Sequence, residues 1–285
     1  MLKAVFSRQK QSQSQGFKEY YSEWFTALKN NLLPLLRRSI SGDSPTILST
    51  HVEMLHQHFQ SYYHALDAAI TSDPTQLLSQ PWRHPLEIPL LWLGDLHPSI
   101  FTNLARSFLH QQQDQEDDDD DDQDQHHHHH HDDDNHSLAD QIDRVSSSSS
   151  SLNLHRPWQV ALAWRNPPES LLLRMDEIEC GLRVIVPTLS DRLARAEAGF
   201  VHRVVGDWFQ CRESKGAAKV AVGEDVRAHM DEVVSVFLCA NRVRRSVLVD
   251  IISAATVYQA ALFLEGLAQF LIGFKDHDLL TSAQH

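Results

Sequence analysis

The stretch from Glu224 to Glu265 constrains the fold more than any other part of the sequence, because it contains neither glycine nor proline. Apolar residues recur along it at spacings of three and four, which is the period of one helix face. This stripe consists of Val226, Met230, Val233, Phe237, Ala240, Val247, Ile251, Ala255, Tyr258 and Leu262, and Arg244 also lies on it. The stretch predicts one very long helix, or two helices with a joint between Asn241 and Ser246.

Similar helical spacing extends over most of the remaining chain. Stripes of apolar residues occupy 17–35, 48–66, 101–108 and 172–204, and we expect a glycine-containing break at 216–223. Ser44-Pro45 and Asp73-Pro74 each combine a side-chain cap with a proline in the first helical turn, which predicts helix starts there. Strictly alternating apolar runs and Asn-Gly or Asp-Gly pairs are absent from the sequence. We therefore predict an all-α fold, a multi-helix bundle of long amphipathic helices.

One segment has a composition that does not suit a packed bundle. Residues 110–136 hold 12 acidic residues, a run of six histidines and no Lys or Arg, and a run of six serines follows at 146–151. Because such a segment cannot bury apolar area, we expect a disordered insert. The predicted organisation is a flexible N-terminus (1–16), an N-terminal helical half (17–109), a disordered acidic, His-rich and Ser-rich insert (110–154) and a C-terminal helical half (155–280).

Charge and motifs exclude several classes of function. The formal net charge is −13, but outside the insert 26 acidic residues face 25 basic ones, so the bulk charge predicts no autonomous nucleic-acid binding. Phosphate-loop, dinucleotide-binding and nucleophile-elbow motifs are absent, and we expect neither enzymatic activity nor a cofactor. The segment Ile251–Phe274 carries Glu265 as its single charge. Its uncharged part is too short for a bilayer span, so we expect a core helix.

The insert offers two weak candidates for binding. The histidines His126, His127, His128, His129, His130 and His131 lie beside aspartates, and imidazole and carboxylate groups are common metal ligands. A repeat expansion tolerated in a linker is the interpretation that we favour, because a metal site needs a rigid frame. The aspartates Asp117, Asp118, Asp119, Asp120, Asp121 and Asp122 are candidates for contacting a basic surface.

A basic cluster in the C-terminal half is a further candidate for interaction. Arg242 and Arg245 share one side of the predicted helix, whereas Arg244 lies on the apolar stripe and must extend to solvent or pair. Contact with anionic lipid headgroups or an acidic partner is one hypothesis. Ion pairing within the protein, for example with Asp231 or Asp250, is the alternative that we favour.

Several short motifs together carry a resemblance to a known family. They are Phe17 to Trp24, Tyr62-Tyr63, Pro81-Trp82, Pro85-Leu86-Glu87, Leu91-Trp92-Leu93-Gly94 and Pro98-Ser99 in the first half, with Ala240 to Arg244, Thr256 to Ala261 and Phe263-Leu264 in the second. This set resembles the plant delay-of-germination domain, which also forms the C-terminal part of TGA-type basic leucine zipper factors. The residues that carry the family motifs or the predicted core are Trp24, Trp82, Glu87, Trp92, Gly94, Pro98 and Gln259. We expect Trp82 and Trp92 to be core anchors.

The sequence departs from the family pattern in two places. Asn241 stands where the family usually has aspartate, and no basic region with leucine heptads precedes the domain. The missing basic region argues against autonomous DNA binding.

The standalone domain with an acidic stretch is most similar to the inaperturate-pollen branch of this family. The resemblance implies a non-enzymatic interaction factor for pollen aperture formation, which keeps patches of the pollen surface free of exine. The expected location is the cytoplasm and the plasma-membrane periphery of developing pollen. Expected partners are other proteins, including a related delay-of-germination-domain protein. A nuclear transcriptional co-regulator that binds DNA through a partner is the alternative, and the oligomeric state stays open.

Overall fold

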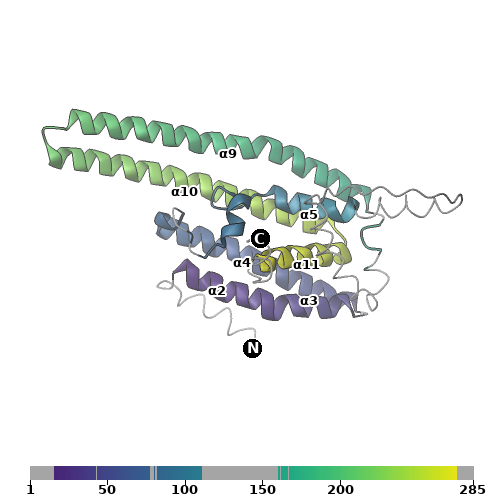
Figure 1. Cartoon of the computed structure of the whole chain (residues 1–285). Helices are drawn as coiled ribbons and strands as arrows, with labels where there is room; N and C mark the ends of the chain where they lie inside the picture. The colour runs from purple at the N-terminus through teal and green to yellow at the C-terminus, as the bar shows by residue number, and fades with distance from the viewer. Residues whose placement is uncertain are drawn as a thin grey trace, which may run out of the picture.

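The computed structural model describes residues 16–42, 44–77, 80, 82–110, 160, 162–165 and 167–274, and its long helices lie side by side (Figure 1). The elements in chain order are α2 (Phe17–Ala27), the π-helical turn η2 (Leu28–Leu32), α3 (Leu33–Ile40), α4 (Pro45–Ser72), the 3-10 helices η3 (Pro74–Leu77) and η4 (Pro85–Leu90), β1 (Leu91–Trp92), β2 (Asp95–Leu96), α5 (Ser99–His110), α9 (Glu169–Gln210), α10 (Lys215–Ala254) and α11 (Val257–Gly273). Within these ranges the only strands are the two residues each of β1 and β2. The predicted all-α fold is confirmed.

The two predicted helix starts in the first half lie where the sequence places them. The Ser44 side chain accepts a hydrogen bond from the amide of Ile47 at 3.5 Å, and Pro45 is the first residue of α4. After α4 ends, the Asp73 carboxylate accepts from the amide of Thr75 at 3.1 Å. The helix that begins there is the short 3-10 helix η3.

The predicted joint between Asn241 and Ser246 is wrong. Helix α10 runs through that segment and ends at Ala254, and α11 begins after Thr256. Thr256 and Gln259 form a capping box, in which the Thr256 hydroxyl accepts from the Gln259 amide at 3.3 Å and the Gln259 side chain accepts from the Thr256 amide at 2.8 Å. This reciprocal cap satisfies two amides that otherwise lack a partner at a helix start, so it fixes the boundary.

The expected break at 216–223 is also wrong, since both of its glycines lie inside α10. The chain reverses over Cys211 to Ser214, and the Ser214 hydroxyl accepts from the amide of Ala217 at 3.4 Å. A glycine lowers helix stability by only about 1 kcal/mol relative to alanine. The extensive pairing of α9 with α10 outweighs that cost.

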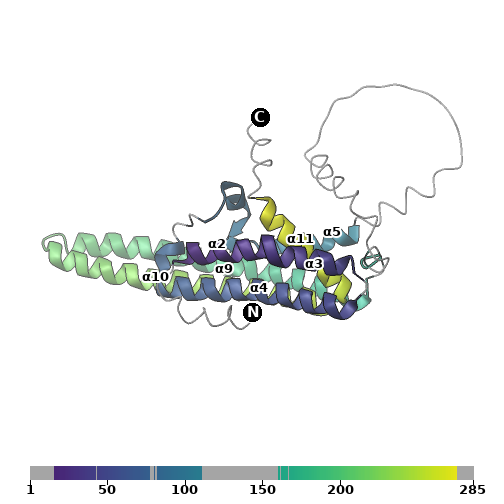
Figure 2. The same ribbon diagram turned by 90° about the horizontal axis from the view of Figure 1, so that it is seen from below.

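Helices from both halves of the chain form one hydrophobic core. Helix α11 packs against α4, α3 and α5, although it follows the insert and they precede it. The main cluster of buried side chains accordingly joins Trp24, Leu55 and Phe59 of the first half to Phe263 and Leu267 of the second. Helices α9 and α10 lie antiparallel, and their far ends extend well past the other helices (Figure 2).

The apolar segment that ends the described chain is a core helix, as expected. Its one charged side chain, Glu265, is buried and accepts a hydrogen bond from Nε of Arg37 at 2.9 Å. A helix of sufficient length and apolar character to cross a bilayer does not occur within the described ranges.

Candidate functional site

The site is built on a tight β-hairpin between η4 and α5. Its two strands pair Leu91 with Leu96 and Trp92 with Asp95. The two turn residues both have positive φ, 44° at Leu93 and 82° at Gly94. Two-residue hairpin turns of this kind favour glycine, whereas a leucine in the left-handed region costs about 1 to 2 kcal/mol. The turn therefore needs support from the surrounding structure.

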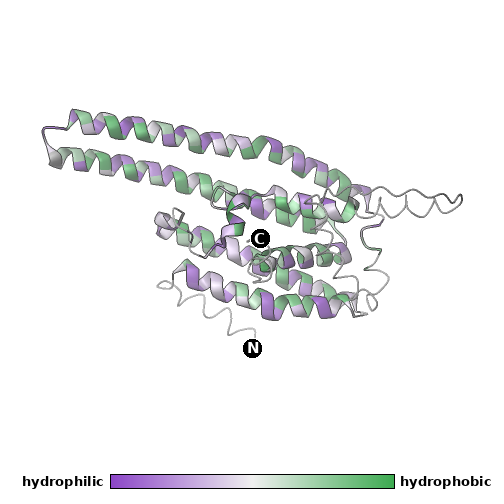
Figure 3. Ribbon diagram, viewed as in Figure 1, coloured by the Kyte–Doolittle hydropathy of each residue, from purple (hydrophilic) through white to green (hydrophobic). Residues whose placement is uncertain are grey.

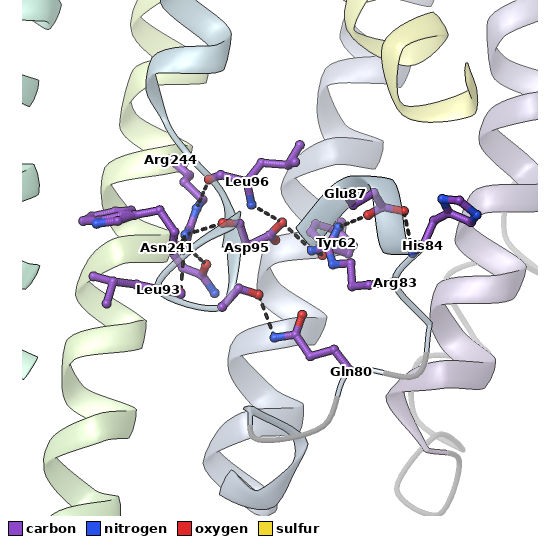
Figure 4. A network of polar contacts seen from close by, with 12 residues as sticks. Tyr62, Gln80, Arg83, His84, Glu87, Leu93, Asp95, Leu96, Asn241 and Arg244 are labelled. Atoms are coloured by element: carbon purple, nitrogen blue, oxygen red, sulfur yellow. Dashed lines mark hydrogen bonds and ion pairs between the residues drawn. The ribbon is translucent and has the colours of Figure 1, made fainter. Parts of the chain in front are cut away.

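Arg244 supplies that support from α10 (Figure 4). Its Nε donates to the carbonyl oxygen of Leu96 at 2.6 Å, and its Nη2 donates to those of Asp95 at 3.0 Å and Leu93 at 3.3 Å. The same nitrogen also contacts the Trp92 carbonyl oxygen. Arg244 is fully buried, so one cation provides donors for the carbonyl groups of Trp92, Leu93, Asp95 and Leu96 from within the protein.

A second arginine holds the other side of the hairpin. Nη1 of Arg83 donates to the Glu87 carboxylate at 2.9 Å, and Nη2 donates to the Tyr62 hydroxyl at 2.7 Å and pairs with the Asp95 carboxylate. Arg83, Glu87 and Asp95 have side chains at most 4% exposed. With Arg244, the buried cluster holds two cations and two anions, a balance that offsets much of the cost of desolvating each charge.

Two further contacts join the hairpin to the loop before it. The Glu87 carboxylate accepts from the amide of His84 at 3.1 Å, while Nδ1 of His84 accepts from the amide of Leu86 at 3.2 Å, so Glu87 both caps η4 and pairs with Arg83. The Gln80 side chain donates to the Gly94 carbonyl oxygen at 2.8 Å.

The electrostatics of the cluster favour a fixed protonation state. Burial lowers the pKa of Arg244. For Arg83 burial acts in the same direction, but the electrostatic interactions with Asp95, Tyr62, Tyr21 and Glu87 together outweigh it and raise the pKa well above the usual value. Burial also raises the pKa of Tyr62, so its phenol stays protonated. Because the pKa values of Arg83 and Tyr62 both move further from neutrality, these two groups are unsuited to general acid or base catalysis.

An outer branch connects the cluster to the surface of α4. Nη1 of Arg244 donates to the Asn241 side chain at 2.7 Å, and Asn241 donates to Asp67 at 2.7 Å. Arg245 pairs with Asp67 at 3.1 Å and lies 3.0 Å from Nδ1 of His64. The expected pairing of the basic cluster within the protein is thus present at Arg245.

The acidic partner of Arg245 is neither of the two residues expected from the sequence, Asp231 and Asp250. Arg245 pairs with Asp67 of α4, whereas Asp250 pairs with Arg174 at 2.6 Å and Asp231 is exposed. The physical reason is tertiary, because α4 packs on α10 and brings its own carboxylate close. Arg242 is exposed and keeps its place as a candidate for interaction.

The residues of the family motifs have different environments. Trp24 and Trp82 are buried, and Nε1 of Trp24 donates to the carbonyl oxygen of His58 at 2.9 Å. Gln259 is buried and donates to the Ala163 carbonyl oxygen at 2.8 Å, and Pro98 is buried just before α5.

The expectation that both tryptophans of the proline-rich segment are core anchors needs correction for Trp92. It is only partly buried, packs against a small second cluster, and donates from Nε1 to the hydroxyl of Ser190 at 2.9 Å. The Arg244 guanidinium lies 5.3 Å from its ring centroid. This partly buried indole therefore joins the hairpin to α9 and α10 and does not belong to the main cluster of buried side chains.

Sequence reasoning did not single out Arg83 or Asp95. The one available signal was Arg244 itself, a charge on an otherwise apolar helical stripe, which required a buried partner. Its partners are mainly backbone carbonyl groups, which have no sequence signature.

The candidates in the insert, Asp117–Asp122 and His126–His131, lie outside the described residues and stay predictions. In the part of the chain that the structure covers, no group of three or more His, Cys, Asp or Glu residues could hold a metal ion.

Part of the chain matches a known domain family. Residues 32–107 match the family described as seed dormancy control, DOG1. This segment contains α4, the hairpin and Arg83, so the class of protein is an all-helical member of that domain family.

Similarity to named relatives extends over nearly the whole chain. It is 39% identical to Protein INAPERTURATE POLLEN1 of Arabidopsis thaliana over 97% of its own length and 95% of the relative. It is 32% identical to the Protein INAPERTURATE POLLEN 1 homolog of Oryza sativa subsp. japonica, over 92% of its length and 86% of that protein. The chain therefore belongs to the INAPERTURATE POLLEN1 family, which confirms the predicted branch.

Proposed function

We propose that this protein is a non-enzymatic factor for pollen aperture formation, which acts through other proteins at plasma-membrane domains of developing pollen. The observation that carries the proposal is the 39% identity to Protein INAPERTURATE POLLEN1 along 97% of the chain. Similarity over that length includes both helical halves, so the inference concerns the whole protein and not one shared domain.

The buried network supports a structural role for the charged residues that most resemble an active site. Arg83 and Arg244 are used to hold the hairpin, and their carboxylate partners are buried with them. The cavity beside them, lined by Tyr62, Arg83 and Asp95 among others, measures about 20 Å³. That volume suits about one water molecule, whereas small-molecule sites usually measure hundreds of Å³.

Attachment to the membrane would be peripheral under this proposal. The exposed Arg242 on α10 offers one basic contact, and a partner protein supplies the rest.

The proposal is tested by expressing a fluorescent fusion of the full chain from its own promoter in a plant that lacks its endogenous INAPERTURATE POLLEN1. We expect discrete patches at the plasma membrane at the tetrad stage, together with restored apertures. The fluorescent protein alone serves as the control for location. A purely nuclear signal with no restored apertures would contradict the proposal and favour a transcriptional co-regulator.

A further inference from the structure

The paired ends of α9 and α10 form an arm that extends beyond the rest of the bundle (Figures 1 and 2). One face of α9 holds α10 in place. Arg203 pairs with Asp225 at 3.0 Å, and the rings of Phe200 and His229 stack with centroids 4.4 Å apart. These contacts identify the inner face of α9 along the arm.

A different face of α9 exposes apolar side chains to solvent. Val201, Val205 and Trp208 are 59%, 63% and 62% exposed, and their spacing of four and three residues places them on one side of the helix, turned away from α10. Val204, half-buried, lies at the edge of this side. We call Val201, Val204, Val205 and Trp208 the α9 stripe. Hydrophobic residues continue along both helices to the far end of the arm (Figure 3).

A row of exposed apolar side chains is unusual on a helix face that contacts no other protein surface. Contiguous exposed apolar surface that includes a tryptophan marks an interaction site more often than a random surface. Spacings of three and four are also those of residues in the seam between two paired helices.

Opposite charges bound the two ends of the α9 stripe. Glu197 precedes Val201 by four residues within α9, and Arg212 follows Trp208 by four, in the turn directly after the end of α9. Both side chains are exposed. Among the residues that the structure describes, neither makes an ion pair, although other charges of the arm, such as Arg203 and Asp225, do. Arg212 instead lies over the ring of Phe209, 4.7 Å from its centroid.

We propose that the α9 stripe is a self-association surface, where it pairs antiparallel with the same stripe of a second copy of this chain. When two copies of the stripe run in opposite directions, complementary side chains lie opposite one another. In this arrangement Val201 faces Trp208 of the second copy, and Glu197 faces Arg212 of the second copy. The two-fold axis passes between Val204 and Val205, so the interface is isologous.

The charges select this orientation over the parallel one. A parallel pairing places Glu197 against Glu197 and Arg212 against Arg212, and like charges in contact are unfavourable. The antiparallel pairing replaces both repulsions with two ion pairs. Because the arms extend beyond the bundles, two chains joined at their arms keep their bundles at opposite ends (Figure 2).

Charge exchange on the full chain tests the orientation. Light scattering after gel filtration, and sedimentation over a range of concentrations, should show a monomer–dimer equilibrium for the unchanged protein. Glu197→Arg or Arg212→Glu alone should each raise the dissociation constant at least tenfold, because like charges then meet. The double variant Glu197→Arg/Arg212→Glu should restore dimerisation. Because both side chains are exposed, the melting temperatures should stay unchanged.

Two further pairs of variants separate this surface from general stickiness. Trp208→Ser should abolish the dimer, whereas Leu173→Ser, which changes a 56% exposed residue of α9 outside the stripe, should not. Val205→Cys should form a disulfide-linked dimer under mild oxidation, since Val205 lies beside the two-fold axis. Val184→Cys, at a 65% exposed position on the same helix, should not exceed the crosslinking of the unchanged protein.

Some results would overturn the proposal. A chain that stays monomeric at every concentration, or a double charge exchange that does not restore the dimer, would contradict it. If the unchanged protein is monomeric but loses binding to anionic vesicles on Trp208→Ser, the stripe is a lipid-docking surface. Aperture formation is not measured in these experiments, so their outcome is independent of the proposed function.

Discussion

The guanidinium of Arg244 donates a hydrogen bond of 3.0 Å to the main-chain carbonyl oxygen of Asp95, 149 residues earlier in the chain. This contact joins a helix of the second half to the hairpin of the first. Because the turn carbonyls are buried, they need a donor from the protein itself. The two halves therefore complete one another and form a single folding unit.

Removal of the Arg244 guanidinium should destabilise the whole protein. Arg244→Met leaves the buried carbonyl groups of the hairpin without their donor and removes one of the two buried cations that balance Glu87 and Asp95, a change that typically costs about 3 to 5 kcal/mol. Urea unfolding followed by circular dichroism measures this change. Arg242→Met changes an exposed neighbour on the same helix and should alter stability by less than about 0.5 kcal/mol. Equal effects of the two variants would contradict the role assigned to Arg244.

Arg83 and Asp95 should be energetically coupled. A double-mutant cycle with Arg83→Met and Asp95→Asn should give a coupling energy of about 1 to 3 kcal/mol, since both side chains are buried and in contact. The loss from either single variant should exceed half of that from the double variant, because each leaves one buried charge unpaired. Strictly additive free energies of unfolding would show that the pair does not interact.

Trp82 and Trp92 should respond differently to truncation. Trp82→Ala removes a buried ring that lies 5.1 Å from Phe17 in an edge-on contact, and should cost about 3 to 5 kcal/mol. Trp92→Ala should cost less, because its ring is partly exposed. Trp92→Phe should lose chiefly the hydrogen bond to Ser190, about 1 kcal/mol. Equal losses for the two alanine variants would contradict this difference, and thermal melts provide the comparison.

Stability should fall as the pH is lowered toward 4, partly because of His58. Burial lowers its pKa to about 4, although a hydrogen bond with the Trp24 carbonyl oxygen opposes this effect. The folded state therefore binds fewer protons than the unfolded state between about pH 6.5 and 4, and its stability decreases over that range.

Since the ring is part-exposed, we expect a loss of about 2 kcal/mol from His58. His58→Gln should remove that part of the pH dependence when unfolding is measured at several pH values. An unchanged slope would show that other groups cause it. His202→Gln, at an exposed histidine of α9, serves as the control.

Deletion of residues 111–136 should leave helical content and melting temperature nearly unchanged. The described residues already form a large hydrophobic core. A composition of aspartate, glutamine and histidine adds no apolar burial. A large drop in melting temperature would show that the segment belongs to the fold. Circular dichroism of the shortened and full chains makes the comparison.

The helices and their buried faces could be predicted locally, because a 3.6-residue period leaves its mark on any stretch long enough to show it. Ser44-Pro45 marked a true helix start for the same reason, since a cap acts within a few residues. The family motifs also identified Glu87 and Gln259, both of which are buried and cap the start of a helix.

Other features were decided by packing between distant parts of the chain. The joint at Thr256 replaced the one expected after Asn241, because Asn241 and Arg244 are held by α4 and the hairpin while α10 continues through them. The choice of Asp67 over Asp250 as the partner of Arg245 likewise depends on which helix lies nearby. Periodicity along the sequence indicates which face of a helix is apolar. The partner of a buried charge depends instead on how helices from the two halves of the chain pack together, and that arrangement exists only in the folded protein.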